Sequence, residues 1–446
     1  MPNKTLKVDR LLALAFFVAL LTSFGGNFFR IVPQDKFSFF QADSQSLVRM
    51  KLLETANGQG VVEGGFLRMN GPFFKASAAN GDAAFDPQET GRYNSQLGLQ
   101  GLFAAVLSKT FSLSADQTVL LAQWLVAASG AAVFGAFFYF LLTKYGTLAA
   151  LPGALIIFFS VHILYFAHNL YWVSFSLFLP YVVTLWLYPA AVFSRRAFNL
   201  LAGLLFAITY IKCLCGYEFI TNIVLSASPV LLFVGIVRSI PWRRMLAHQS
   251  IFAFACILGF LLAMATHLTF LAASLGSVEA AITAVADRAL QNTVDATSLT
   301  SNIVAAKYVT PGTGTILAII KYLSFPAVNI GSYPPFGDNE YFVFRSTYFG
   351  PFALSVIMAS ACFTAARRRV IDPALRLSLN GVAASLPWAF VCSISWIVAA
   401  KVHSIHHFHL VSIVLCFPFL LHLGLCLAVV LQSLLTKLRQ PSEFSP

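Results

Sequence analysis

The chain has 446 residues, of which 58% are hydrophobic and only 10% are charged, and its formal net charge is +12. A soluble protein of this length could not bury so much apolar surface, so this composition excludes that class. The basic residues stand at the edges of apolar runs and form no patch interleaved with aromatic residues, so nucleic-acid binding is not indicated either.

Apolar runs of bilayer length recur along the whole chain without a two-residue alternation, which predicts an all-α polytopic membrane protein. We expect about ten transmembrane helices. Their predicted bounds are 11–29, 117–142, 148–167, 170–190, 198–214, 220–238, 250–275, 346–365, 378–400 and 409–435. The first run lacks a small-x-small cleavage site, so it is expected to be an uncleaved span and not a signal peptide.

Basic residues locate the cytoplasmic side, since short cytoplasmic loops are enriched in Lys and Arg. Lys4, Lys7 and Arg10 precede the first span, and further basic clusters fall in the loops that return to the same side. The excess of basic over acidic residues in these inside segments equals the formal net charge of +12 of the whole chain. Both termini are therefore expected in the cytoplasm.

Two long segments fall on the outer face, which predicts that the protein works there. The expected organisation is a cytoplasmic N-terminus with the first span (1–29), a first outer loop (30–116), spans two to seven (117–275), a second outer loop (276–345), spans eight to ten (346–435) and a cytoplasmic tail (436–446). Amphipathic helices are expected over Asp43–Thr55, 93–111 and 277–293. Between the first two, residues 57–91 are rich in Gly, Asn and Asp, which predicts turns.

Asp43 stands directly before the first of these amphipathic helices, and two interpretations of it stay open. It is either an N-cap, whose carboxylate accepts a backbone N–H, or a general base on the outer surface. A carboxylate has two oxygens, so one side chain could do both. Asp35 is the fallback for the general base.

The stretches "ADSQSLVRMKLLETANGQG" (42–60) and "RYNSQLGLQG" (92–101), together with long outer loops after spans one and seven, resemble the GT-C superfamily of polytopic glycosyltransferases. Members often carry paired acids at the first-loop position, whereas this chain has Asp43 followed by Ser44. The resemblance covers most of the chain as topology and about 20 to 60 residues as motif. A metal-assisted reaction is not indicated, and no cofactor is expected.

The resemblance implies an inverting glycosyltransferase in a bacterial inner membrane, with its active site on the periplasmic face. Its partners would be a polyprenyl-phosphate-linked sugar, an outer-face acceptor and membrane lipids. Asp43 would take the proton of the acceptor hydroxyl, and cations would hold the phosphate of the leaving group. Arg345, Lys401 and Lys212 stand at the outer ends of predicted spans and are the candidates; the alternatives are snorkelling to the interface and, for Lys212, pairing with Glu218.

The stretch "KVHSIHHFHL" (401–410) places His403 and His407 four residues apart, on one face of a helix. Three interpretations stay open: phosphate or sugar binding, an interfacial cluster without chemistry, and a metal site, for which no acidic residue lies nearby. The seven cysteines form no pattern with metal spacing, and no metal site is assigned. The residues expected to contact substrate are Arg49, Tyr93, Gln96, His168, Glu218, Tyr333, Asp338, Glu340 and Tyr341.

Two other functions stay open. A transporter or flippase for a lipid-linked glycan would carry ionisable residues deep in the membrane, within helices broken there. A ligase or polymerase of O-antigen type would rely on Arg and His residues in a late outer loop, which the stretch 401–410 could supply.

Overall fold

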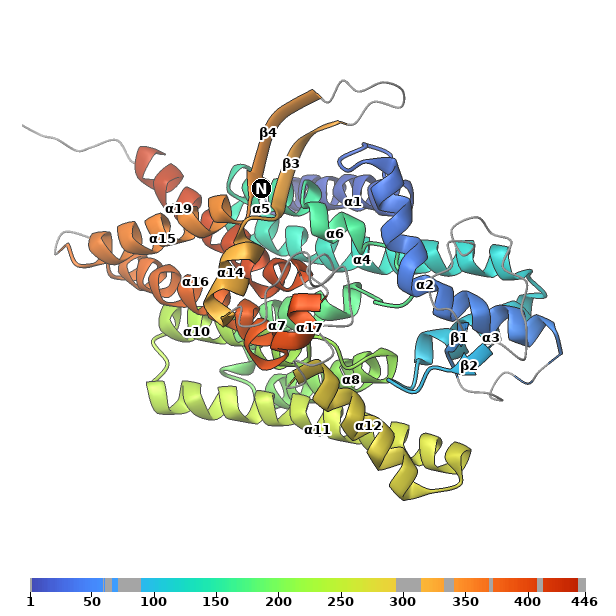
Figure 1. Cartoon of the computed structure of the whole chain (residues 1–446). Coiled ribbons are helices and arrows are strands. Elements are labelled where there is room, and N and C mark those ends of the chain that lie inside the picture. Colours follow the sequence, from blue (N-terminus) through green and yellow to red (C-terminus); the bar gives the residue numbers. More distant parts are fainter. Residues whose placement is uncertain are drawn as a thin grey trace, which may run out of the picture.

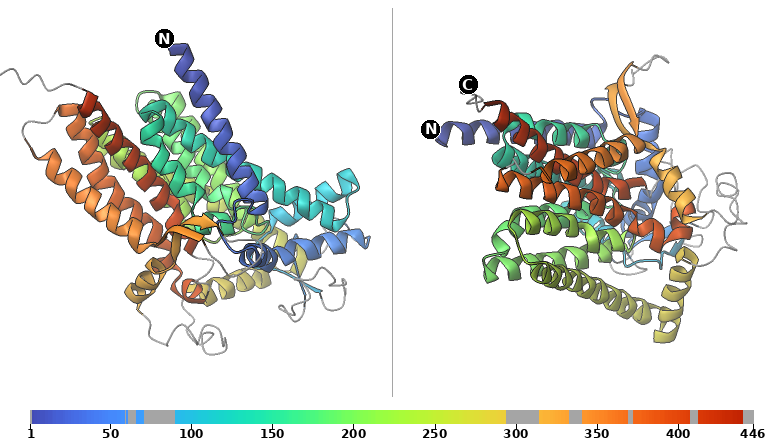
Figure 2. Two further views of the ribbon diagram at one scale, coloured as in Figure 1. Left: turned by 90° about the horizontal axis from the view of Figure 1, so that it is seen from above. Right: turned by 90° about the vertical axis from the view of Figure 1, so that its left-hand side faces the viewer.

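The computed structural model describes residues 2–58, 60, 66–70, 90–293, 314–332, 341–368, 372–406 and 412–439. Long apolar helices form one bundle, and shorter helices with two small hairpins gather at one of its ends (Figures 1 and 2). The described part of the chain is almost wholly helical, which confirms an all-α polytopic membrane protein.

Among the residues that the structure describes, eight helices are long and apolar enough to cross a membrane. They are α1 (Pro2–Gly26), α4 (Ala115–Tyr145), α8 (Arg195–Cys215), α9 with α10 (Ile220–Ser226 and Ser228–Val237), α11 (Trp242–Leu275), α15 (Phe349–Ala366), α16 (Pro373–Ala399) and the last stretch, made of η3 (Ser412–Leu415), η4 (Cys416–Leu420) and α19 (Leu421–Arg439). Each overlaps a predicted span.

The third and fourth predicted spans are shorter in the structure than in the sequence interpretation. They correspond to α5 (Thr147–Phe158), followed by the one-turn helix α6 (Val161–Tyr165), and to α7 (Phe175–Ala191). Residues 166–174 form an irregular connection between α6 and α7, where the predictions had placed helix ends. A multi-pass membrane protein is thus supported, while the number of ten spans stays a prediction.

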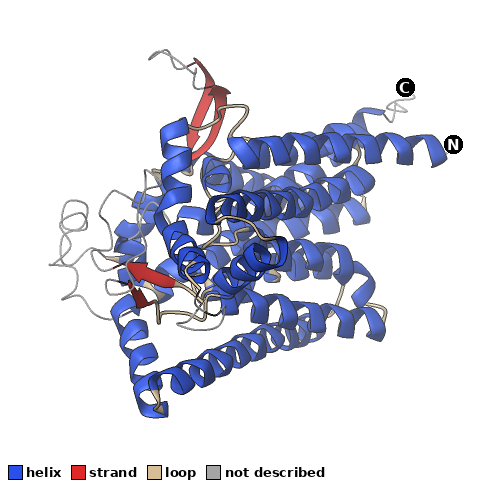
Figure 3. Ribbon diagram, turned by 90° about the vertical axis from the view of Figure 1, so that its right-hand side faces the viewer, coloured by secondary structure: helices blue, strands red, loops and turns tan. Residues whose placement is uncertain are grey.

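Ring contacts give the relative directions of the helices. Phe24 meets Phe134 and Phe16 meets Phe138, so α1 and α4 run antiparallel. Phe134 meets Phe178 and Phe140 meets Trp186, so α4 and α7 run parallel. The first turn of α1 and the last turn of α19 lie at one end of the bundle (Figure 3), which we call the terminal end. The opposite end is the cap end.

The cap end carries the elements that do not belong to the long bundle (Figure 2). They are α2 (Gln34–Ala56), α3 (Leu99–Phe111), α12 (Val278–Thr293), α14 (Thr315–Leu323), α17 (Lys401–His406), the hairpin β1–β2 (Arg68–Asn70 and Thr90–Arg92) and the hairpin β3–β4 (Pro326–Ser332 and Tyr341–Thr347). Both hairpins are antiparallel, and neither was expected from the sequence. The expected helix at 277–293 is confirmed as α12.

The prediction that Asp43 caps a helix is wrong, because α2 begins at Gln34 and Asp43 lies nine residues further along it. Pro33 precedes the first turn; proline fixes φ near its helical value and lacks an N–H, so the helix starts earlier than the charge pattern indicated. The expected helix at 93–111 is also shorter, because α3 begins only at Leu99. Gly98, at φ +81°, turns the chain before α3, and its N–H donates to Leu214 O.

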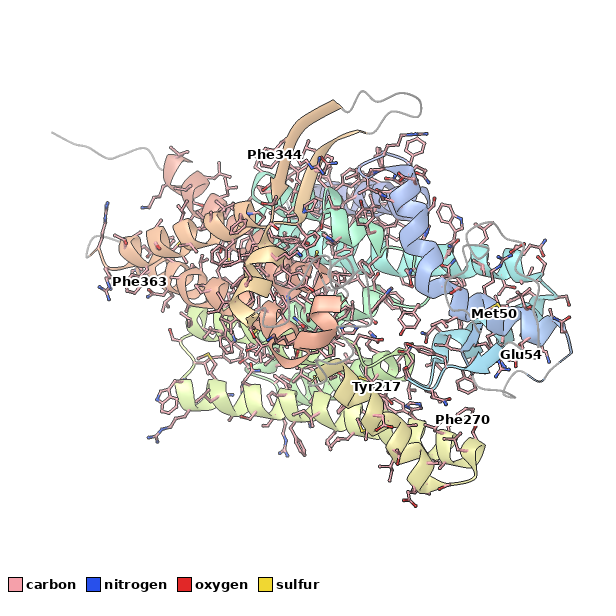
Figure 4. All side chains as sticks on the ribbon, viewed as in Figure 1. Met50, Glu54, Tyr217, Phe270, Phe344 and Phe363 are labelled. Carbon is pink, nitrogen blue, oxygen red and sulfur yellow. The ribbon has the colours of Figure 1, made fainter. Side chains whose placement is uncertain are left out.

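A buried ion pair fastens α2 to the first hairpin. Lys51 Nζ lies 2.8 Å from Glu54 Oε2, with both side chains fully buried, and Arg68 Nε on β1 lies 2.9 Å from Glu54 Oε1. Figure 4 labels Glu54 and Met50 on this part of α2. Buried charges are tolerated where they are paired in this way. The pair therefore fixes the position of α2 across the cap end.

Candidate functional site

Four polar side chains from three separate parts of the chain meet at the cap end around Tyr171. The Tyr171 hydroxyl lies 2.8 Å from Glu218 Oε1, 3.1 Å from Gln96 Oε1 and 3.2 Å from the hydroxyl of Tyr93. We call these four residues the Tyr171 network. Tyr93 and Gln96 come from the first long loop, Tyr171 from the connection at 166–174, and Glu218 from the turn after α8. Tyr93, Gln96 and Glu218 were all expected at a substrate site.

The segment before α3 is fastened onto the ends of its neighbours by hydrogen bonds to the backbone. Gln100 Nε2 donates to Tyr171 O at 3.1 Å and to Cys215 O at 3.0 Å. The N–H of Gly98 donates to Leu214 O at 3.0 Å. A buried amide with two acceptors is held in one orientation, so this segment holds Gln96 against the turn that carries Glu218.

Gly216 lets the Glu218 carboxylate fold back over the backbone. A Cβ at this position would lie 2.4 Å from Glu218 Oε2 and 2.8 Å from Gln96 Oε1. Its φ of 170° is ordinary extended backbone, so what favours glycine here is the close approach and not the backbone conformation. The sequence "CGYE" therefore brings a carboxylate and an amide together above the end of α8.

Lys212 lies one turn before this glycine and is 1% exposed. Its ammonium donates to Gly216 O at 3.0 Å, which also satisfies a carbonyl at the end of α8. The expected alternative of a Lys212–Glu218 ion pair is not found, since no carboxylate oxygen lies within 4.0 Å of Lys212 Nζ in the described part of the chain. An ammonium carries three protons, so it can donate to further acceptors.

Burial raises the pKa of Tyr171 well above its ordinary value, and the neighbouring Glu218 carboxylate raises it further. The phenol therefore stays protonated at neutral pH. It has one proton to donate, and the charged carboxylate at 2.8 Å is its closest acceptor. The site thus combines an oriented carboxylate, a neutral phenol, an amide and a buried cation, a set that can bind hydroxyl groups and a phosphate.

Asp43 lies on α2 at the same cap end, and its side chain is not among those that the structure describes. Asp35, the fallback, is exposed on the first turn of α2 and lies 3.7 Å from Lys36. Arg49 forms an ion pair with Asp116 at the start of α4, at 2.9 Å, outside the Tyr171 network. Because Asp116 is 79% exposed, this pair is a surface contact between α2 and α4.

His168 packs away from the Tyr171 network although it is only three residues from Tyr171. Its ring lies edge-on to Phe37 of α2, with centroids 4.9 Å apart, and its side chain is 6% exposed. Burial lowers the pKa of His168 to about 4, so this imidazole is neutral at pH 7. Its contacts join α2 to the connection at 166–174.

The remaining candidates lie on other elements of the cap end. Arg345 is exposed on β4, next to Phe344, which is 53% exposed and labelled in Figure 4.

Two candidates of the stretch 401–410 lie on α17. Lys401 begins this helix, and His403 accepts a hydrogen bond at Nδ1 from Trp396 Nε1, at 3.3 Å. A neutral His403 therefore carries its own proton on Nε2. Tyr341 begins β4, and its side chain is not described. Four further candidates lie outside the described residues: His407, Tyr333, Asp338 and Glu340.

Sequence reasoning missed Tyr171 and Gln100, which organise the network. Both residues are uncharged. Tyr171 lies within the predicted span 170–190 and Gln100 within the predicted amphipathic helix 93–111, and their hydrogen-bond partners are distant in sequence. No local pattern marks such residues.

In the described part of the chain, no group of three or more His, Cys, Asp or Glu side chains could hold a metal ion. Comparisons with protein-family models, curated proteins and solved structures found no match.

Proposed function

We propose that this chain is an integral-membrane glycosyltransferase that moves a sugar from a polyprenyl phosphate to an acceptor at the cap end. The observation that carries the proposal is the Tyr171 network beside the buried Lys212. Four residues selected from the sequence as substrate or phosphate ligands lie around Tyr171 and the turn at Gly216. They are Tyr93, Gln96, Glu218 and Lys212. A carboxylate, an amide and an ammonium together suit a sugar phosphate better than an apolar ligand.

In the proposed reaction, the Asp43 carboxylate accepts the proton of an acceptor hydroxyl as its oxygen attacks the anomeric carbon. The bond between that carbon and the phosphate oxygen breaks, and the polyprenyl phosphate leaves with the electron pair. A single displacement inverts the anomeric configuration. The leaving phosphate gains negative charge, which a nearby cation stabilises.

Lys212 is the proposed phosphate ligand, because it is a buried cation with donor capacity left after its bond to Gly216 O. Glu218 and Gln96 are the proposed partners of sugar or acceptor hydroxyls, held in place by Tyr171. Arg345, Lys401 and His403 are secondary candidates on neighbouring elements of the same end.

Comparing Asp43→Asn with Asp35→Asn tests the proposal. Membranes carrying each variant are given a panel of radiolabelled polyprenyl-phosphate sugars, and label transferred to envelope material is counted. A lost general base costs roughly 100-fold or more in rate, so Asp43→Asn should lower transfer by at least about that factor while Asp35→Asn retains the wild-type rate. Full activity of Asp43→Asn would contradict the role of Asp43, and loss in Asp35→Asn alone would assign that role to Asp35.

A carrier for lipid-linked glycans is the second candidate, and one group of buried contacts favours it. His422 of α19 is fully buried, with Nδ1 3.0 Å from the Tyr181 hydroxyl and Nε2 2.7 Å from Ser385 Oγ. It follows η4, where Phe417 leaves helical geometry, so the last apolar stretch is interrupted beside an ionisable residue. Transporters use interrupted helices of this kind.

A flipping assay separates the two functions. Proteoliposomes carry a fluorescent polyprenyl-phosphate sugar, and dithionite quenches only the label in the outer leaflet. A carrier would raise the quenched fraction above that of empty liposomes and lose this effect in His422→Leu. A glycosyltransferase would leave it at the empty-liposome level.

A further inference from the structure

Five arginines gather at the terminal end of the bundle, where α7 connects to α8 and α10 connects to α11. All five are exposed, and no ion pair involves any of them within the described residues. They are Arg195, Arg196, Arg238, Arg243 and Arg244. We call them the arginine patch.

Contacts across the two connections show that the patch is one surface. The guanidinium carbon of Arg238 lies 5.9 Å from the centroid of the Phe193 ring. Arg244 Nη2 donates to Val192 O at 2.7 Å. Side chains from the connection after α10 and from the start of α11 therefore pack on the connection after α7, and the positive charges are held close together.

Helix stability explains only the position of Arg238, which is the C-cap of α10, and it disfavours the other four arginines, which stand in first turns. Arg195 opens α8, and Arg243 follows Trp242 at the start of α11. The helix dipole disfavours cations in a first turn and favours them in a last turn. Like charges placed together also repel, so the patch carries a cost that an anionic partner would remove.

The surface next to the patch is apolar, which decides the kind of anion. Phe193 is 74% exposed and Trp242 is 63% exposed, each beside an arginine of the patch. Along the parallel helices α8 and α11, exposed apolar side chains continue away from the patch. They are Leu200, Leu246, Ile251, Phe254, Leu258 and Leu261. A free phosphate would use only the charges, whereas a lipid would use the whole surface.

We propose that the arginine patch binds the headgroup of an anionic phospholipid, with the acyl chains along the exposed faces of α8 and α11. The phosphodiester would accept hydrogen bonds from the guanidinium groups, which suit phosphate geometry. Phe193 and Trp242 would lie at headgroup depth, where aromatic side chains gather. This site is at the opposite end of the bundle from the Tyr171 network and does not depend on the reaction there.

Native mass spectrometry of the full chain in detergent, titrated with phosphatidylglycerol or phosphatidylcholine, tests this proposal. The test variant is Arg195→Gln/Arg238→Gln/Arg243→Gln, which spares Arg244 and its bond to Val192. The control variant is Lys7→Gln/Lys144→Gln/Lys437→Gln, which removes equal charge from α1, α4 and α19 at the same terminal end. Circular dichroism and gel filtration check that both variants are folded.

The arginine variant should bind phosphatidylglycerol at least about tenfold more weakly than the wild type, because it removes three guanidinium groups from one headgroup site. The lysine variant should stay within about twofold of the wild type, and phosphatidylcholine binding should not change. Equal weakening in both variants would show general charge attraction and overturn the site. Unchanged binding in the arginine variant, or displacement of the lipid by millimolar inorganic phosphate, would also overturn it.

Discussion

The hydroxyl of Tyr171 lies 2.8 Å from Oε1 of Glu218 and joins two connections that are 47 residues apart in sequence. Burial keeps the phenol protonated, so it donates to the carboxylate and fixes the carboxylate's orientation. A carboxylate held this way presents its other oxygen, Oε2, beside Gln96 above Gly216.

Replacing Tyr171 with Phe should destabilise the protein, because the bond to a charged acceptor is lost inside a buried site. We expect a loss of about 1–3 kcal/mol, measured as a lower unfolding midpoint in detergent. Tyr93→Phe is the matched variant; its hydroxyl is half-buried and makes the longer 3.2 Å contact, so it should cost less. Equal losses in the two variants would contradict the assigned roles.

Gly216→Ala should reduce sugar transfer, because the new methyl group would displace the Glu218 carboxylate and the Gln96 amide. It should also cost about 1–3 kcal/mol of stability, since the Tyr171–Glu218 hydrogen bond is disturbed. Gly203→Ala, in the same helix α8, meets no atom within 4 Å and serves as the control. The control should be neutral or more stable by up to about 1 kcal/mol. If Gly216→Ala transfers sugar at the wild-type rate, the position of Glu218 does not matter for function.

Glu54→Gln should be strongly destabilising, because it leaves Lys51 as a buried charge without its carboxylate partner. Breaking a buried pair costs about 3–5 kcal/mol. The double variant Lys51→Met/Glu54→Leu should recover part of this loss, since no buried ammonium remains, while Arg68 loses its contact with Glu54 but keeps a side chain that is 12% exposed. The measurement is the thermal unfolding midpoint of the wild type, Glu54→Gln and the double variant. A double variant no more stable than Glu54→Gln would contradict the assigned role of the Lys51–Glu54 ion pair.

The wild type should lose stability as the pH falls from 7.5 to 5, in part through His168. Its folded pKa of about 4 lies below the ordinary value of 6.5, so between these values the unfolded state binds more protons than the folded state. This contribution reaches up to about 2 kcal/mol at pH 5. His168→Gln does not titrate, so its unfolding midpoint should fall less over the same range, and an identical fall would contradict the neutral buried imidazole.

The sequence was sufficient to predict the membrane class and the positions of most of the long apolar helices, because apolar runs of bilayer length require helices in lipid. It placed α12 correctly. It also selected as candidate ligands four residues that the structure brings close together, namely Tyr93, Gln96, Lys212 and Glu218. The start of α2 was misjudged because the polar residues around Asp43 imitate a helix start, while Pro33 sets the real one. The hairpin β1–β2 was missed because its strands have only three residues each. The hairpin β3–β4 was missed because its seven-residue strands follow no regular hydrophobic alternation.

The contacts that build the site could not be predicted in the same way. Tyr171 and Gln100 act through partners more than 40 residues away, and Gln100 bonds to backbone carbonyls whose positions depend on the complete bundle. Lys212 reads from the sequence as a snorkelling residue at a span end, yet its side chain is buried against the turn at Gly216. Such features follow from tertiary packing, which no local pattern encodes.

The most direct test of the account is photo-crosslinking of the purified full chain with a photoreactive polyprenyl phosphate, with the labelled peptides mapped by mass spectrometry. We predict labels in residues 93–100 and 212–218, competed by unmodified polyprenyl phosphate and reduced in Lys212→Met but not in Lys109→Met, an exposed lysine on α3. Labels confined to other parts of the chain, or unchanged in Lys212→Met, would contradict the proposal that the lipid phosphate binds beside the Tyr171 network.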